Sequence, residues 1–333
     1  MITTVDYHTA GEPFRIVIGG APELPGSTVL DRRERAMVGP ADGVRALLCN
    51  EPRGHADMYG CFLVPPDDAG AVLGTLFWHK DGFSTACGHG TIALGTYAVD
   101  EGLVDAPDDG EVDVVIDVPS GRVAARVERA GGRTRSVAFR NVPGFVLARR
   151  VPVPTTRGGI EVDLSYGGAT YASARAADLG LSVTPANLTT LIAVGREIRD
   201  AINASGAAAH PAERRLDGCY GTIWYDDEGS TEDGPRQRNC TVFADGEVDR
   251  SPCGSGTSAR LVLLHADGLL PDGAVLHHDS IIGTTFTGRV VEELTLHDRP
   301  AVVTEVRGSA YRTGTHTFTL DPSDPLGKGF QLR

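Results

Sequence analysis

The chain has 333 residues, of which 41% are hydrophobic, enough to bury two ordinary cores. Its formal net charge of −13 argues against nucleic acid or an anionic membrane as a partner, and solubility alone accounts for this acidity. The start, MITTVDYHTAGEPF, does not read as a leader peptide, and no apolar run reaches membrane-spanning length, so we expect a cytoplasmic protein.

Strands are predicted where apolar and polar residues alternate between Gly, Pro and Asp. The segments with this pattern are 15–20 (RIVIGG), 113–118 (DVVIDV), 122–127 (RVAARV) and 301–306 (AVVTEV). The stretch 226–238, DDEGSTEDGPRQR, is polar and rich in turn residues, which predicts a surface loop.

Helices are predicted at 91–102 and 257–268, where the apolar spacing is helical and the last residue is a glycine in the C-cap region. A third helix is predicted at 185–204 from leucines and isoleucines that fall on one face. With the strands, these helices indicate the α+β class.

A second feature is an internal repeat. When Cys87 is laid over Cys253, the next glycines, threonine and alanine also coincide, and Phe77 falls on Phe243. Collinear matches occur at 120–123 with 287–290 and at Val5-Asp6 with Val162-Asp163. We therefore expect an ancient duplication that gives two pseudo-symmetric mixed-sheet domains with a central helix each. The expected limits are 1–150 with the Cys87 loop, 151–313 with the Cys253 loop, and a C-terminal segment, 314–333, that packs back on the first half.

Composition narrows the chemistry further. Six cysteines over this length are too sparse for a disulfide framework, and Cys49 and Cys61 lie in apolar runs typical of a core. The sequence has no C-x-x-C pair and no two histidines four apart on a predicted helix, so a zinc site has little support. Only Lys80 and Lys328 are lysines, which argues against pyridoxal-phosphate chemistry, because that chemistry needs a Schiff-base lysine.

The repeated loop reads Cys-Gly-x-Gly-Thr at a helix start. The N–H groups of a first helical turn bind an anion, and the helix dipole stabilises a thiolate there. If both helix starts face one cleft between the halves, an amino-acid carboxylate between them would have one sulfur on each side of its α-carbon. One thiolate would then remove the α-proton while the other thiol delivers one, which inverts the configuration.

Each candidate residue also has a structural interpretation. Cys87 and Cys253 are small enough to be ordinary core residues, and a backbone carbonyl could satisfy His89, whose matching position holds Ser255. Asp249 could pair with a substrate ammonium or form a turn in DRSP. Four further candidates could likewise have either a functional or a structural role: His55, Asp57, Phe77 and Phe243. A non-catalytic amino-acid-binding protein is the alternative from a different class.

At these residues the sequence resembles the proline racemase family. The resemblance rests on DYHTAGEPFRIVIGG, NEPRGHADMYG, ACGHGTIALG, LSYGGATYA, DRSPCGSGTSAR and DPSDPLGKGF, and it spans essentially the whole chain. It implies a cofactor-independent homodimeric enzyme with the two-domain architecture of diaminopimelate epimerase, in which Cys87 and Cys253 are the acid/base thiols. It further implies that the carboxylate is bound by backbone N–H groups of Gly88, His89, Gly254 and Ser255, that His89 and Asp249 contact the ring nitrogen, and that Phe243 packs on the ring.

The family contains proline racemases, 4-hydroxyproline 2-epimerases and trans-3-hydroxy-L-proline dehydratases. The dehydratases typically have threonine at the second cysteine position, so Cys253 favours a racemase or 2-epimerase acting on proline or a hydroxyproline. The stretches ALGTYAVDEGLV, YGTIWYDDEG and CTVFADGEVDRSP instead resemble the dehydratase branch, which is the alternative.

Overall fold

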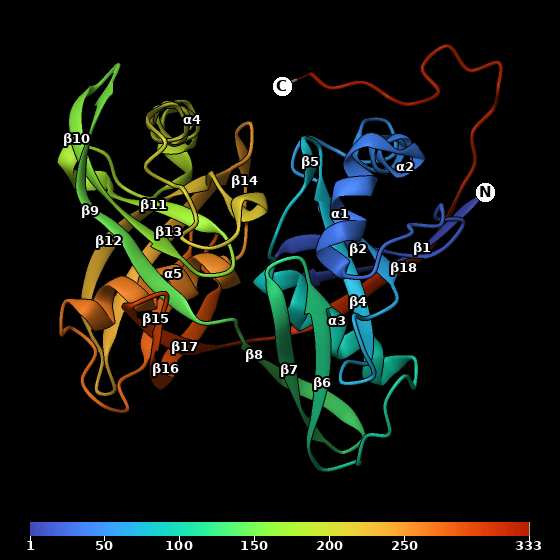
Figure 1. The fold of residues 1–333 in the computed structure, drawn as a ribbon, viewed down its shortest axis with the longest axis horizontal. Helices are drawn as coiled ribbons and strands as arrows, with labels where there is room; N and C mark the ends of the chain where they lie inside the picture. The colour runs from blue at the N-terminus through green and yellow to red at the C-terminus, as the bar shows by residue number, and fades with distance from the viewer. Residues whose placement is uncertain (333) are drawn as a thin grey trace. The chain divides into compact units, whose positions relative to one another are not determined.

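A computed structural model describes residues 1–332 as two compact units (Figure 1). Unit 1 comprises Met1–Val137 and the residues from Ser309 on, and unit 2 comprises Ala138–Gly308. Within residues 1–332, no helix combines the length and the apolar content needed to cross a membrane.

Unit 1 is a mixed sheet with three helices. Its strands are β1 (Ile2–Thr9), β2 (Glu12–Gly19), β3 (Gly60–Val64), β4 (Leu73–His79), β5 (Gly82–Phe83), β6 (Gly110–Val118), β7 (Gly121–Ala130), the first part of β8 (Arg133–Arg140), and β18 (Ala310–Phe318). Its helices are α1 (Val29–Val38), α2 (Pro40–Cys49) and α3 (Gly88–Asp100).

Unit 2 has the same kinds of element. Its strands are β9 (Gly144–Thr155), β10 (Gly158–Tyr166), β11 (Thr170–Arg175), β12 (Cys219–Ser230), β13 (Pro235–Phe243), β14 (Glu247–Val248), β15 (Leu276–Ser280), β16 (Thr285–Leu296) and β17 (Arg299–Gly308). Its helices are α4 (Leu188–Ser205) and α5 (Gly254–Ala266), with short 3₁₀ turns at Ala176–Leu179, Pro185–Asn187 and Arg214–Leu216.

Strand pairing repeats between the units. In unit 1, β1–β2 is antiparallel, β2–β3 parallel, β3–β4 and β4–β5 antiparallel, β4–β6 parallel and β6–β7 antiparallel. In unit 2 the pairs β10–β11, β11–β12, β12–β13, β13–β14, β13–β15 and β15–β16 follow in the same order with the same directions. Helices occupy matching places, since α3 and α5 each connect the fifth strand to the sixth. This order supports the duplication inferred from the sequence.

The last strand of each repeat joins the other unit. β9 follows β8 in the chain but pairs with β10, and β18 follows β17 but pairs with β1. Val5 therefore lies between Ile16 of β2 and Thr315 of β18, much as Leu164 lies between Ala172 of β11 and Ala148 of β9. Because of this exchange, the limits of the compact units differ from the limits of the sequence repeats. The domain limits expected from the repeat, 1–150, 151–313 and 314–333, remain a prediction about the duplicated segments.

Each unit has its own hydrophobic core. The core of unit 1 includes Leu48, Phe62 and Trp78, and that of unit 2 includes Leu164, Ile198 and Trp224. In unit 2, α4 buries the face that carries Leu191, Val194, Ile198 and Ile202, so the predicted helix over 185–204 is confirmed, its first residues forming the 3₁₀ turn.

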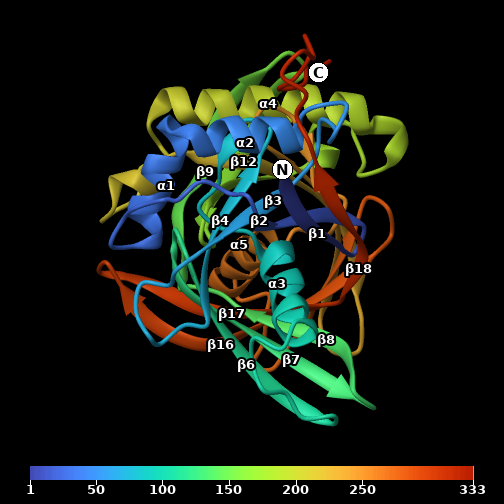
Figure 2. The ribbon, with the colours of Figure 1, turned by 90° about the vertical axis from the view of Figure 1, so that its right-hand side faces the viewer.

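The helices that follow the cysteine loops are buried on every side. All residues from Gly88 to Ala98 of α3 and from Gly254 to Leu264 of α5 are buried. In unit 1, α3 packs against β1, β7 and β18 (Figure 2). In unit 2, α5 packs against β9, β10, β16 and β17. A helix this enclosed holds its first turn in place, which matters for any chemistry at that end.

The α+β class and the four predicted strands are confirmed, while one element was predicted wrongly. The segment 226–238 is not a loop, because it forms the distal ends of β12 and β13, which pair as a hairpin around a turn at 231–234. Most of its strand residues are polar and partly or fully exposed, and the two strands pair through charge: Arg238 donates to Glu228 on the other strand at 2.8 Å. The segment was predicted as a loop because these strand ends lack the apolar alternation that marks the other predicted strands.

Candidate active site

Cys87 is the N-cap residue of α3 and is 4% exposed. Its Sγ accepts a hydrogen bond from the backbone N–H of Gly90 at 3.2 Å, in the way a serine or aspartate oxygen caps a helix. Thr91 also stabilises the loop, because its Oγ1 donates to the Cys87 carbonyl oxygen at 2.8 Å. The sulfur thus lies at the positive end of the α3 dipole, which favours its thiolate form.

Gly90 is needed for this contact. A Cβ at Gly90 would lie 2.4 Å from Cε2 of Phe14 and 2.8 Å from the Cys87 Sγ, both closer than real Cβ contacts allow. The second glycine of the repeated motif therefore makes room for the sulfur and for an aromatic ring.

His89 lies directly beside the sulfur. Its Nδ1 and Nε2 are 3.4 and 3.6 Å from the Cys87 Sγ, and the residue is 4% exposed. The imidazole meets the rings of Phe14 and Tyr59 edge-on, with centroids 5.7 and 5.0 Å away. The His89 carbonyl oxygen accepts from Thr9 Oγ1 at 2.9 Å. Backbone and ring are thus both held in place.

Unit 1 also contains three other candidates from the sequence, His55, Asp57 and Phe77. Phe77 is fully buried and packs on Phe14, with centroids 6.1 Å apart. Asp57 is buried, and its backbone N–H donates to Nδ1 of the exposed His55 at 3.2 Å.

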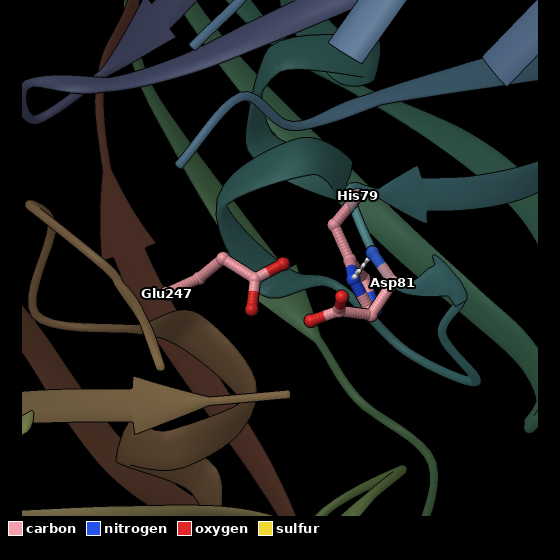
Figure 3. Close-up of side chains that lie close together, drawn as sticks. All are labelled: His79, Asp81 and Glu247. Carbon is pink, nitrogen blue, oxygen red and sulfur yellow. Dashed lines mark hydrogen bonds between the residues drawn. The ribbon is translucent and has the colours of Figure 1, made fainter. Parts of the chain in front are cut away.

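The turn between β4 and β5 has a similar local contact. The N–H of Asp81 donates to His79 Nδ1 at 3.2 Å, as the dashed line in Figure 3 marks. Figure 3 also draws Glu247 of β14 in unit 2, the residue that matches Asp81 at the offset of the cysteine loops.

Cys253 caps α5 in a different conformation. Its φ of 63° is in the left-handed region, which non-glycine residues rarely adopt and which costs on the order of 1–3 kcal/mol. Its side chain does not cap α5 as that of Cys87 caps α3, although a hydrogen bond from the backbone of Gly256 lowers the pKa of its thiol. Burial raises the pKa of this thiol well above its usual value, and the negative charge of Asp249 raises it further.

Tyr171 is a polar neighbour of Cys253. The Tyr171 hydroxyl lies 3.8 Å from the Cys253 Sγ and 2.7 Å from the Ser255 Oγ. Sequence analysis did not single out Tyr171 as a site residue. The alignment of the repeats could have done so, because GGATYA aligns with GEPF and Tyr171 then corresponds to Phe14.

Asp249 and Phe243 flank this loop in unit 2. Asp249 Oδ1 accepts from the N–H and Oγ of Ser251 at 2.8 and 2.7 Å, and Ser251 Oγ accepts from the N–H of Cys253 at 3.1 Å. Phe243 stacks on Tyr220, whose ring meets Tyr171 edge-on. Unit 2 thus brings together Phe243, Asp249, Cys253 and Ser255, while unit 1 brings together Cys87 and His89.

A buried histidine, His278, contacts the first turn of α5. Thr257 Oγ1 lies 2.8 Å from His278 Nδ1 and donates to the Pro252 carbonyl oxygen at 3.2 Å. The residue before Cys253 is thereby tied to β15.

Comparisons with known proteins identify the family of this chain. The family model described as proline racemase matches residues 4–331. The trans-3-hydroxy-L-proline dehydratase of Bacillus cereus is 42% identical over 99% of this chain and 98% of its own length, and the trans-L-3-hydroxyproline dehydratase of Bos taurus is 45% identical over 100% and 95%. A crystal structure of a hydroxyproline epimerase from Agrobacterium vitis, with bound trans-4-OH-L-proline, has a TM-score of 0.91 at 32% identity and covers 99% of this chain and 95% of that one. The chain belongs to the proline racemase family.

Proposed function

We propose that this enzyme is a dehydratase that removes water from trans-3-hydroxy-L-proline, with Cys87 as the base that takes the α-proton. The observation that carries the proposal is that full-length relatives of this chain at 42–45% identity are named as dehydratases of this substrate.

The surroundings of Cys87 suit a base. The Gly90 N–H and the positive end of α3 both stabilise negative charge on its sulfur. A thiolate in that position can accept a proton from carbon, while other backbone N–H groups of the first turn are suited to hold a carboxylate.

The surroundings of Cys253 act in both directions. Burial and the charge of Asp249 raise the pKa of its thiol, while hydrogen bonds from Gly256, Tyr171 and Thr241 lower it. An enzyme that inverts an α-carbon in both directions needs two groups with matched proton affinities, because each must donate in one direction and accept in the other. Elimination needs only one carbon base, and the hydrogen bond from the Gly90 N–H makes Cys87 the candidate for that role.

The substrate contacts expected from the family remain part of the proposal. Backbone N–H groups of Gly88, His89, Gly254 and Ser255 would bind the carboxylate. His89 and Asp249 remain candidates for the ring nitrogen, and Phe243 for the ring face.

A racemase or 2-epimerase of proline or a hydroxyproline is the second candidate. It is favoured by Cys253 itself, because the second repeat also places a thiol at the start of a buried helix. The A. vitis epimerase, at 32% identity, supports it as well.

One experiment separates the two candidates. The purified protein is incubated in D₂O with L-proline, trans-4-hydroxy-L-proline or trans-3-hydroxy-L-proline, and the α-proton and the product configuration are followed by NMR. Loss of the 3-hydroxyl with formation of Δ1-pyrroline-2-carboxylate supports the dehydratase. Appearance of the opposite α-configuration supports the racemase or epimerase, and the absence of any α-exchange would point to a binding protein.

Two substitutions refine the result. Cys87→Ser should abolish dehydration, whereas Cys253→Ala should leave α-proton removal intact and eliminate any inversion. Complete loss of dehydration in Cys253→Ala would contradict the assignment of Cys87 as the sole carbon base.

The proposal includes a homodimer in the cytoplasm, as the family resemblance implies. Light scattering of the purified chain tests the first point, and cell fractionation tests the second.

A further inference from the structure

We propose that the imidazole of His89 is the acid that protonates the departing 3-hydroxyl, on the same face of the ring as Cys87. This inference rests on the proposed dehydratase function and adds a chemical role for His89 beyond contact with the ring nitrogen, which then falls to Asp249.

The stereochemistry of the substrate sets the requirement. In trans-3-hydroxy-L-proline the carboxylate and the 3-hydroxyl lie on opposite faces of the ring. The α-hydrogen is opposite the carboxylate, so it shares a face with the hydroxyl on the adjacent carbon. The base for the α-hydrogen and the acid for the hydroxyl must therefore act from one side and lie within a few ångström of each other.

Cys87 and His89 meet this requirement. The imidazole nitrogens lie 3.4 and 3.6 Å from the sulfur, so a base and an acid stand side by side at one helix start. Both residues are 4% exposed, and the rings of Phe14 and Tyr59 border the imidazole. This enclosure would keep water from competing for the proton.

Tyr59 is itself fixed in position. Its hydroxyl lies 2.5 Å from the Ser84 Oγ, and its ring stacks on Phe14 with centroids 6.4 Å apart. The imidazole is thus confined by side chains that are themselves held, as an acid with a directional task requires.

The proton balance closes within this pair. The Cys87 thiolate takes the α-hydrogen, the electron pair of the Cα–H bond forms the Cα=Cβ bond, and the Cβ–O bond breaks. The protonated His89 gives its proton to the leaving oxygen, which departs as water. Cys87 is then a thiol and His89 is neutral, and transfer of the proton from Sγ to the adjacent ring nitrogen restores both groups. The enamine product tautomerises to Δ1-pyrroline-2-carboxylate.

The second repeat lacks this arrangement. Ser255 occupies the place of His89, and its Oγ is hydrogen-bonded to Tyr171. A hydroxyl is a much weaker proton donor than an imidazolium, so the acid for the leaving group belongs to the first repeat.

The test uses His89→Gln and His89→Asn in the full-length protein with three reactions. Dehydration of trans-3-hydroxy-L-proline should fall by about 10²- to 10⁴-fold, the usual contribution of a general acid. Exchange of the α-proton of L-proline with D₂O should persist, because it needs the base only. Elimination from trans-3-fluoro-L-proline should also persist within a small factor, because fluoride leaves without prior protonation. His265→Gln, a partly exposed histidine near the end of α5, is the matched control and should behave as wild type.

The outcomes separate the two levels of the proposal. Wild-type protein that does not dehydrate trans-3-hydroxy-L-proline overturns the proposed function and the role of His89 together. Wild-type dehydration that survives in both His89 variants overturns only the role of His89. Parallel loss of all three reactions in well-folded variants would also overturn that role, because His89 would then act by tuning Cys87.

Discussion

The Tyr171 hydroxyl lies 2.7 Å from the Ser255 Oγ, while in the first repeat the matching residues, Phe14 and His89, meet through their rings at a centroid distance of 5.7 Å. One pair of positions therefore supports a hydrogen bond in unit 2 and an aromatic contact in unit 1. The duplication kept the order of the elements around the site and changed the chemistry around each sulfur.

Tyr171→Phe should make Cys253 less reactive. The hydrogen bond from Tyr171 lowers the pKa of Cys253, so its loss raises that pKa and slows alkylation at a fixed pH. The lost bond should also reduce the free energy of unfolding by about 1 kcal/mol. Mass spectrometry of iodoacetamide labelling and urea titration measure the two effects, with the exposed Tyr311→Phe as the control. Faster labelling of Cys253 would contradict this account.

Asp249→Asn should have the opposite effect on the same thiol. The charge of Asp249 raises the pKa of Cys253, so a neutral amide lowers it and increases the thiolate fraction. The amide oxygen can still accept the two hydrogen bonds from Ser251. The pH midpoint of Cys253 alkylation should move down, whereas Asp245→Asn, a partly exposed acid paired with Arg196, should leave it unchanged. An upward or absent shift would show that burial alone sets the pKa.

Gly90→Ala should disrupt the Cys87 loop. The added methyl would clash with Phe14 and with the Cys87 sulfur, which is expected to cost about 1–3 kcal/mol and to displace the sulfur from its N–H donor. Gly43→Ala in α2 is the matched control, since a Cβ there meets nothing within 4 Å and should stabilise the helix by about 0.5–1 kcal/mol. Thermal unfolding of both variants tests the contrast, and equal stability would refute it.

His278 should make stability depend on pH. Burial lowers the pKa of His278 to about 3, with a further contribution from Arg260, while the unfolded chain has the ordinary value near 6.5. The unfolded state therefore binds the proton first. The stability that neutral His278 provides is complete above pH 6.5 and is lost as the pH falls toward 3, at up to about 1.4 kcal/mol per pH unit.

His278→Gln should remove this dependence, because glutamine does not titrate. Urea unfolding between pH 6.5 and 5 should give a flatter curve for His278→Gln than for wild type, and His265→Gln should keep the wild-type slope. Identical slopes for all three proteins would contradict this account. They would mean that the protonation of His278 does not differ between the folded and unfolded states in that pH range.

Local patterns in the sequence predicted much of this fold. The helices after the cysteine loops and the four strands were found because their residues alternate or recur with a clear period. The helix α1 was missed because its sequence, VLDRRERAMV, is charged and buries only Val29, Arg32 and Ala36. Its start does carry a signal, a capping box between Thr28 and Asp31, which could have located it.

Other features have no local signal. Which sheet β9 or β18 joins depends on the free edges available in the folded molecule, and the strand sequences do not encode that choice. The unusual φ of Cys253 is similarly invisible, because Cys-Gly-x-Gly-Thr reads the same in both repeats while the two cysteines adopt different backbone conformations. The repeat predicted that the two cysteines correspond; their unequal surroundings emerge only from packing.

The exchange of β9 and β18 imposes an order of assembly during synthesis. Unit 2 is a single continuous segment, Ala138–Gly308, and is complete before β18 leaves the ribosome. Unit 1 cannot close until β18 has been made, because β1, which precedes unit 2 in the chain, obtains its outer neighbour only then. Until then β1 presents an open sheet edge, a template for pairing with another chain. A chain truncated before Ala310 would keep both cysteine loops and yet remain prone to aggregation. Pairing of β18 with β1 is therefore the step that covers the open edge of unit 1.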